Sequence, residues 1–302
     1  MADKPSSPIF GRLALIGIGL IGSSIARVAK RENLAGHISA SARTQDSLDK
    51  AIELGFADSV SLDQKAAVKD ADMVIICAPV GAYEEIIKTI APALKPGAIV
   101  SDVGSVKQAV VRDLGPHIPE GVHLIPAHPV AGTEHSGPEA GFPELFEDRW
   151  CIITPPPGTD EKSVDRVTQF WEALGSDVEI MEPNHHDLVM AMTSHLPHLI
   201  AYTIVGTATD LEKSLTNEVI KFSAGGFRDF TRIAASDPTM WRDVFLNNRD
   251  AVLEMLQRFS EDITALQRAI RWGEGETLHD LFSRTQEVRR GVIEAKQEKM
   301  YD

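Results

Sequence analysis

Cysteine, basic charge and long apolar runs are all scarce in this sequence. Only two of its 302 residues are cysteines. Both Cys77 and Cys151 lie among apolar neighbours, so we expect reduced core thiols rather than a disulfide framework. Lysine and arginine number 30 against 44 aspartates and glutamates, a net charge of −14. Because a nucleic-acid interface needs a basic face, we expect no nucleic-acid partner.

The sequence also lacks the usual patterns of a membrane-spanning segment and of a metal site. The uncharged run from Leu13 to Ala26 resembles a signal peptide, but it is shorter than the roughly 20 apolar residues that cross a bilayer. We therefore expect a cytoplasmic protein that does not contact a membrane. The histidines of the second half do not show the spacing of three or four converging zinc ligands, so we expect no metal.

Short apolar runs alternate with helical patterns over residues 9–182, which is typical of a parallel, doubly wound α/β sheet. The expected strands cover residues 13–16, 38–40, 73–77, 98–102, 122–125, 151–153 and 178–181, with helices over 21–30, 46–54 and 163–174. After Pro183 the strand patterns stop, and we expect Asn184 to cap a long helix. Residues 183–302 are therefore predicted to form an all-α domain.

The stretch from Met240 to Trp272 is predicted to be long and amphipathic. Its apolar side chains near one face are Leu246, Leu253, Leu256, Phe259 and Ile263. Such a stripe indicates either a subunit interface or an ordinary core within the chain. We favour the interface, and so expect a homodimer formed through the helical domain.

A glycine-rich turn follows the first expected strand and opens the first expected helix. Gly17 permits a tight turn, Gly19 lets the backbone approach a pyrophosphate, and Gly22 lets the helix pack close to the strand. The amides at the helix start, Leu20 and Ile21 among them, then face the phosphates. In this context the motif predicts a Rossmann domain that binds NAD(P).

The end of the second expected strand bears on the choice of dinucleotide. NAD enzymes usually place an acid there for the ribose 2′-hydroxyl, but no acid stands at this point before Asp46. Arg43 would suit a 2′-phosphate, with Ser41 and Thr44 as hydroxyl donors, and this favours NADP over NAD. Alternatively, Arg43 only stacks on the adenine. Pro79, after the third strand, is also predicted to line the cofactor site.

Polar side chains follow later strands at the edge where ligands bind in such sheets. His128 is the candidate for acid–base chemistry, because a neutral imidazole can accept or polarise a hydroxyl proton near pH 7. Ser105 is predicted to orient that imidazole or the nicotinamide. A structural histidine and a helix N-cap are the respective alternatives.

The helical domain carries two further candidate clusters. His195 and His198 lie one helical turn apart around Pro197, which we expect to kink the helix. The segment from Gly225 to Asp243 is rich in arginine, and a guanidinium binds carboxylates through paired hydrogen bonds. Internal Arg–Asp pairing is the alternative, but we expect Arg232 to meet substrate. His185 and His186 are interpreted as surface residues at a helix start.

Four of these segments together resemble the prephenate/arogenate dehydrogenases, called cyclohexadienyl dehydrogenases when they accept both substrates. The segments are Asp102–Lys107, Ala127–Glu134, Ser194–His198 and Gly226–Ala234. The resemblance covers roughly residues 10 to 300. It implies tyrosine biosynthesis through oxidative decarboxylation: hydride passes to NAD(P), carbon dioxide leaves and the ring becomes aromatic.

The resemblance also implies roles for individual residues. His128 would hydrogen-bond the ring hydroxyl, and Ser105 would support that histidine and the nicotinamide. His198 would contact substrate, and Arg232 would bind a substrate carboxylate. The remaining implied positions are a polar gate at Glu134 and a packing or inhibitor-side residue at Trp241.

Two other functions stay open on the sequence alone. A 3-hydroxyacid-type dehydrogenase shares the two-domain plan but usually relies on a lysine of a long helix, and no lysine follows Pro183 before Lys213. A non-catalytic NADP-binding sensor would keep the glycine turn but would need neither His128 nor Arg232. The sequence does not separate prephenate from arogenate.

Overall fold

The computed structural model describes residues 7–133, 135–210, 221–222 and 225–294. The chain divides into two compact units, Met1–Arg249 and Asp250–Asp302. The first unit contains the sheets and the first helices of the C-terminal half. The second contains most of a helical hairpin.

A six-stranded sheet forms the centre of the first unit, with strand order β3-β2-β1-β4-β5-β6. Every pairing in it is parallel. This is the order of a doubly wound dinucleotide-binding fold, so the predicted architecture is confirmed. The strands are β1 (Phe10–Ile16), β2 (Ala35–Ser41), β3 (Ser59–Ser61), β4 (Met73–Ile76), β5 (Ile99–Asp102) and β6 (His123–Leu124).

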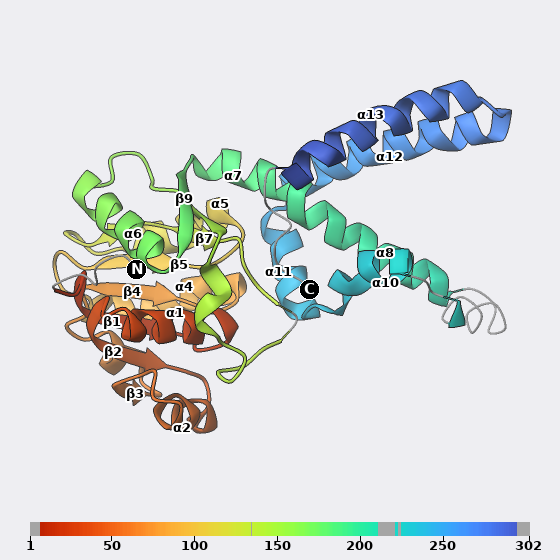
Figure 1. The fold of residues 1–302 in the computed structure, drawn as a ribbon. Coiled ribbons are helices and arrows are strands. Elements are labelled where there is room, and N and C mark those ends of the chain that lie inside the picture. Colours follow the sequence, from red (N-terminus) through yellow and green to blue (C-terminus); the bar gives the residue numbers. More distant parts are fainter. Residues whose placement is uncertain (1–6, 134, 211–220, 223–224, 295–302) are drawn as a thin grey trace. The chain divides into compact units, whose positions relative to one another are not determined.

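Helices cover both faces of this sheet (Figure 1). They are α1 (Leu20–Arg31), α2 (Gln45–Glu53), α3 (Gln64–Val68), α4 (Tyr83–Ile90), α5 (Lys107–Leu114) and α6 (Glu161–Ala173). Short 3₁₀ turns are η1 (Val80–Ala82), η2 (Ala91–Ala93), η3 (Gly115–His117) and η4 (Pro143–Phe146).

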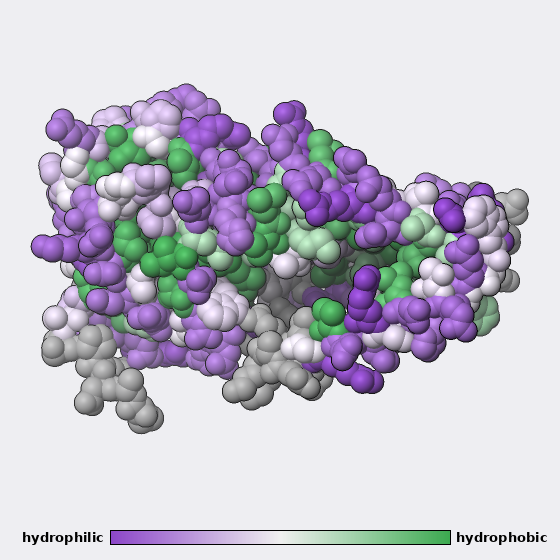
Figure 2. All heavy atoms as spheres, turned by 90° about the horizontal axis from the view of Figure 1, so that it is seen from above, coloured by the Kyte–Doolittle hydropathy of each residue, from purple (hydrophilic) through white to green (hydrophobic). Residues whose placement is uncertain are grey.

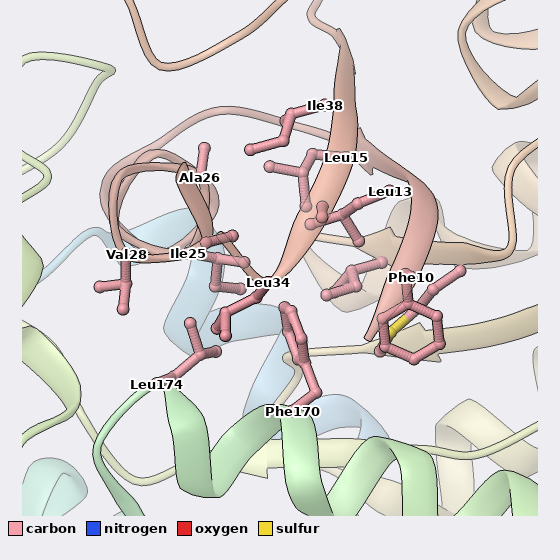
Figure 3. Close-up of a cluster of buried hydrophobic side chains, with 14 of the residues drawn as sticks. Phe10, Leu13, Leu15, Ile25, Ala26, Val28, Leu34, Ile38, Phe170 and Leu174 are labelled. Atoms are coloured by element: carbon pink, nitrogen blue, oxygen red, sulfur yellow. The ribbon is translucent and has the colours of Figure 1, made fainter. Parts of the chain in front are cut away.

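The uninterrupted apolar run Leu13–Ile16 of β1 follows from burial on both faces. Leu13 and Leu15 belong to one hydrophobic cluster, whereas Ala14 and Ile16 belong to a second cluster across the sheet. Figure 3 shows Phe170 of α6 pointing toward β1 and α1 in the first cluster. The sheet is therefore fixed from both sides, and its carboxyl edge becomes a rigid platform for the loops beyond it.

The strands after residue 125 do not extend the parallel sheet, although the sequence pattern suggested that they would. They form a separate sheet of β7 (Ala127–Pro129), β8 (Arg149–Ile153) and β9 (Ser176–Ile180). β7 is antiparallel to β8, and β8 is parallel to β9. The apolar runs located β8 and β9 but carry no information on strand direction, and β7 was not expected because Ala127-His128-Pro129 does not form an apolar run.

Helices follow from Pro183, as predicted. They are α7 (Pro183–Met190), α8 (Leu196–Thr209), α10 (Gly225–Thr231) and α11 (Pro238–Asn247), with a 3₁₀ turn η6 at Arg232–Ala235. A π-helical turn, η5 (Ala191–His195), joins α7 to α8 and leads into Pro197. Asn184 is not the cap: α7 begins at Pro183 after Glu182, because proline is well suited to a first helical position.

By length and composition alone, the segment Pro183–Thr209 could cross a membrane. Of its most apolar stretch of 18 residues, 28% is buried. Core helices of soluble proteins pass the same test. In this chain the segment also carries His186, Asp187 and His195, which are all buried.

Two long helices, α12 (Arg249–Trp272) and α13 (Gly275–Glu294), lie side by side as a hairpin (Figure 1). Gly273 turns the chain between them with φ +71°. The predicted helix from Met240 to Trp272 is therefore interrupted at Asn248, where α11 ends. Hydrophilic residues cover most of the face shown in Figure 2, with hydrophobic patches between them. Exposed apolar residues of the hairpin are Leu253, Ile263, Ile270, Trp272, Phe282 and Val288.

Candidate active site

The glycine turn after β1 is shaped by close backbone packing at two of its three glycines. Gly17 has φ +100°, and a Cβ there would collide with the carbonyl of Cys77. A Cβ at Gly22 would collide with the carbonyl of Gly17. Gly19 differs, because an added Cβ would meet no atom within 4 Å. The first and third glycines thus serve packing, and the second leaves open space.

That open space lies at the start of α1. Gly19 is the N-cap of this helix, and no side chain caps it. The first amides of a helix have no partner within the helix and carry a partial positive charge, so they suit a phosphate group. The turn therefore fits the pyrophosphate of a dinucleotide.

The end of β2 lies next to this turn, since Gly17 donates its backbone N–H to the carbonyl of Ser41 at 2.8 Å. The Ser41 hydroxyl is buried and has no partner among the described residues. Arg43 is exposed. Thr44 is the N-cap of α2 and accepts the N–H of Ser47 at 3.3 Å. Pro79 directly precedes η1 after β4.

A buried ion pair organises the carboxyl end of β5. Lys107 Nζ lies 2.6 Å from Asp102 Oδ2, and both side chains are fully buried. Burial raises the pKa of Asp102 and lowers that of Lys107, while their mutual attraction opposes both shifts. Tyr83 Oη and the backbone N–H of Gly104 also donate to Asp102. With only donors around it, the carboxylate form of Asp102 fits this position.

The same pair positions β7, which carries His128. Lys107 Nζ donates to the carbonyl of Ala127 at 2.6 Å, and Asp102 Oδ1 accepts the N–H of Ala127 at 3.2 Å. Both backbone groups of the residue before His128 are therefore held at the carboxyl end of β5. His128 consequently stands at the same edge of the sheet as the glycine turn after β1.

His128 is 8% exposed and contacts a second imidazole, that of His186. His128 Nδ1 lies 2.8 Å from His186 Nε2, and His186 Nδ1 lies 2.8 Å from Asp187 Oδ1. His186 is fully buried, so its assignment as a surface residue was wrong. Its neighbour His185 is the exposed one. A helix start has a buried face as well as a solvent face, and the sequence did not show which face His186 occupies.

Burial keeps these histidines uncharged. It lowers the pKa of His128 well below its ordinary value, and repulsion from the positive charge of Lys107, and from His186 and His195 when they are protonated, acts in the same direction. Burial also lowers the pKa of His186 to about 2. At neutral pH His128 is therefore a neutral imidazole, with a lone pair on one of its two ring nitrogens.

His195 joins the same network from the π-helical turn. Asn248 Nδ2 donates to the carbonyl of Asp187 at 2.9 Å and lies 3.0 Å from His195 Nδ1. His195 therefore accepts at Nδ1, and burial lowers its pKa to about 4. Its Nε2 is buried without a partner among the described residues.

His198 and Trp241 form a stacked pair, with ring centroids 3.7 Å apart. His198 Nδ1 donates to the carbonyl of Ser194 at 2.9 Å, so the lone pair of the neutral ring is at Nε2. Burial lowers the pKa of His198, and the nearby charge of Arg232 lowers it further. Trp241 is buried, and its Nε1 has no partner among the described residues. Helix α8, helix α11 and the turn η6 thus bring two polar ring groups and the cation of Arg232 together.

Two further site residues were predicted, Ser105 and Glu134. Ser105 lies between β5 and α5 without a hydrogen bond to any described residue, and the N-cap of α5 is Val106 rather than Ser105. Glu134 lies outside the described residues. Within the described ranges, no group of three or more His, Cys, Asp or Glu residues is arranged to hold a metal.

Comparison with known proteins assigns the chain to a family. Residues 25–180 match the prephenate dehydrogenase nucleotide-binding domain, and residues 182–284 match the prephenate dehydrogenase dimerization domain. The chain belongs to the prephenate dehydrogenase family. It is 40% identical to the cyclohexadienyl dehydrogenase of Zymomonas mobilis, covering 93% of this chain and 96% of that protein. It is 32% identical to the prephenate dehydrogenase of Bacillus subtilis, covering 93% and 76%.

Solved structures agree with this assignment. Prephenate dehydrogenase from Aquifex aeolicus, in complex with hydroxyphenyl propionate and NAD+, matches with a TM-score of 0.87 and 33% identity over 93% of this chain and 98% of that one. Synechocystis arogenate dehydrogenase matches with a TM-score of 0.80 and 26% identity over 93% and 99%. Both the sheet and the helical half therefore belong to one known architecture.

The different surroundings of Gly19 and Gly22 predict different mutant phenotypes. Gly22→Ala should lower the free energy of unfolding by about 1–3 kcal/mol, because its Cβ overpacks the turn. Gly19→Ala should leave thermal unfolding unchanged but raise the dinucleotide Kd by about tenfold or more, a loss of about 1.4 kcal/mol. Thermal melts and nucleotide titrations check both variants. Equal destabilisation by both would contradict these assignments.

The buried His195 is expected to make the free energy of unfolding depend on pH. Its folded-state pKa of about 4 lies below the unfolded value near 6.5, so the folded state favours the neutral ring. This contribution is complete above pH 6.5 and is lost as the pH falls toward 4, by an amount on the order of 3 kcal/mol. Denaturant titrations between pH 4 and pH 8 should show a shallower decline for His195→Gln than for wild type. His185→Gln, at an exposed position, should follow the wild-type curve.

Proposed function

We propose that this protein catalyses the oxidative decarboxylation of prephenate, arogenate or both, with NAD(P) as the oxidant. One observation carries the proposal within the family: the buried, uncharged His128 is held at the same sheet edge as the glycine turn. The reaction requires a base and a hydride acceptor side by side, and this edge provides a place for each.

His128 acts on the ring hydroxyl of the substrate. The bound dinucleotide accepts the hydride that leaves the carbon bearing this hydroxyl. As that carbon becomes a carbonyl, Nε2 of His128 takes the hydroxyl proton, and the proton returns to the oxygen when carbon dioxide leaves and the phenol forms. No net proton is therefore consumed, and aromatisation drives the reaction forward. Ser105 supports His128 and the nicotinamide at the same edge.

The helical half binds the anionic part of the substrate. Arg232 pairs with a substrate carboxylate, because a guanidinium fork suits that group. His198 contacts the substrate through Nε2, which its bond to Ser194 leaves available. Trp241 supports the His198 ring by stacking. Glu134 acts as a polar gate in this proposal, on the family resemblance alone.

NADP is the favoured dinucleotide. The amides of Leu20 and Ile21 and the three glycines of the turn hold the pyrophosphate. The exposed Arg43 and the unpartnered Ser41 hydroxyl support a site for the 2′-phosphate beyond β2. Thr44 contributes its hydroxyl there as well as capping α2, and Pro79 lines the nicotinamide side.

The protein acts as a cytoplasmic homodimer. Residues 183–209 form an apolar segment, and only 28% of its most apolar 18-residue stretch is buried. Apolar surface left exposed in this way indicates an interface that a second copy would cover. The family description of residues 182–284 as a dimerization domain supports the same arrangement. The nucleotide-binding family model ends at residue 180 and the dimerization model begins at residue 182. This supports a division of the chain into a dinucleotide-binding domain over 9–182 and a substrate and dimerisation domain over 183–302.

A substrate and cofactor matrix tests the function directly. Prephenate and arogenate are each assayed with NAD and with NADP by the absorbance of the reduced cofactor. His128→Asn should lower kcat by about 10²–10⁴-fold, the usual effect of removing a general base, with cofactor Kd nearly unchanged. His185→Asn is the matched control at an exposed position. Absence of turnover in all four wild-type assays would refute the function, and wild-type turnover by His128→Asn would refute the role of that residue.

The cofactor preference rests on Arg43. Arg43→Ala should raise KM for NADP by about tenfold or more, since a hydrogen bond to a charged group contributes about 1.5–3 kcal/mol. KM for NAD should change little, because NAD lacks the 2′-phosphate. Steady-state kinetics with each cofactor measure the ratio. Equal effects on both would show that Arg43 does not read a 2′-phosphate.

A further inference from the structure

A line of three buried polar side chains runs from the candidate base into the protein. It links His128 on β7 to His186 and Asp187 at the start of α7, through the two contacts of 2.8 Å described above. His186 is fully buried, and Asp187 is 1% exposed. The reaction proposed above gives no role to either residue.

We propose that Asp187 and His186 are positioning residues that hold His128 in the tautomer with its proton on Nδ1, so that Nε2 is free to act as the base. The catalytic consequence rests on the proposed function, but the tautomer itself is a property of the resting protein. His186 and Asp187 touch neither substrate nor cofactor in this proposal.

The carboxylate oxygens of Asp187 lie among hydrogen-bond donors. Oδ1 accepts the backbone N–H of Lys107 at 2.7 Å, and Oδ2 accepts the N–H of Gln108 at 3.0 Å. These are the first two amides of α5, where the helix dipole favours a negative charge. Burial raises the pKa of Asp187, but the two amides and the charge of Lys107 counteract it. The ionised carboxylate fits this position because it can only accept hydrogen bonds.

The proton positions then follow along the line. Because Asp187 accepts, His186 must donate from Nδ1, and the neutral ring then has a lone pair at Nε2. Because His186 Nε2 accepts, His128 must donate from Nδ1, and its lone pair is at Nε2. A carboxylate thus determines the tautomer of the base through an intervening imidazole. In serine-protease triads a carboxylate sets the tautomer of the catalytic histidine directly.

The neighbouring charges favour the neutral form of both rings. Lys107 and His195 face His128, His186 and Asp187, and the positive charge of Lys107 lowers the pKa of both His128 and His186. The Cys151 thiol lies beside the backbone of His128, and burial raises its pKa, so it stays uncharged. No second carboxylate among the described residues competes with Asp187 for His186.

Substitutions of His186 separate positioning from packing. His186→Phe keeps an aromatic ring but removes the acceptor for His128 Nδ1–H. His186→Gln keeps an acceptor at that place through Oε1. His185→Phe is the matched control one residue earlier, where the side chain is exposed. Thermal melts and NAD(P) titration establish that each variant is folded.

We expect His186→Phe to lower kcat by roughly 100-fold, with KM nearly unchanged. His186→Gln should recover most of that loss, and His185→Phe should match wild type. In His186→Phe, the acid limb of the pH profile of kcat/KM should move to lower pH, because protonated His128 loses its hydrogen-bond acceptor. In His186→Gln, the acid limb should stay near its wild-type position. Wild-type kcat and an unmoved acid limb in His186→Phe would overturn the proposal.

The tautomer can be measured without any substrate. ¹⁵N-histidine NMR of the wild-type protein, assigned with His128→Asn, should show His128 protonated at Nδ1 and unprotonated at Nε2 at neutral pH. A proton on Nε2 instead would overturn the proposal whether or not the protein turns over prephenate. The expected NMR result without turnover of prephenate or arogenate would instead refute the proposed function and leave the positioning intact.

Discussion

The buried ion pair between Lys107 and Asp102 is the contact on which the site depends. It joins the end of β5, the start of α5 and the residue before His128, three segments that no other single contact described above brings together. Burying two charges is costly unless every hydrogen-bonding group around them is satisfied. Here Tyr83 and two backbone amides complete the shell of Asp102. Loss of either charge would leave the other unpaired in the core.

The start of α5 extends the influence of this pair. Its first amides hold Asp187, which in turn contacts His186, so helix α7 is tied to the sheet at the point where the candidate base stands. Asn248 then ties the end of α11 to the carbonyl of Asp187. The polar groups of the sheet half and of the first helices after Pro183 therefore form one connected network. Its members are buried, which keeps the imidazoles neutral in a protein of net charge −14.

Much of the architecture could be predicted because it rests on local patterns. The apolar runs located the buried strands, and the spacing of Gly17, Gly19 and Gly22 located the turn whose close contacts the structure displays. Strand direction in the second sheet could not be predicted, because the apolar run of β8 reads the same whichever way the strand runs. The strand β7 itself could not be found, because Ala127-His128-Pro129 does not form an apolar run. His186 and His185 are adjacent and chemically identical, so nothing local distinguishes the buried one from the exposed one.

The sequence by itself determined the residue types and their order: a glycine turn between a strand and a helix, a histidine after a later strand, and an arginine-rich segment beyond. Each follows from spacing along a few neighbouring residues. Only the tertiary structure decided which groups meet, since Lys107, His128 and Asp187 lie far apart in the chain and are joined through hydrogen bonds across three elements. Burial, which sets both the charge and the partner of each imidazole, is a property of the packed fold and not of any local segment.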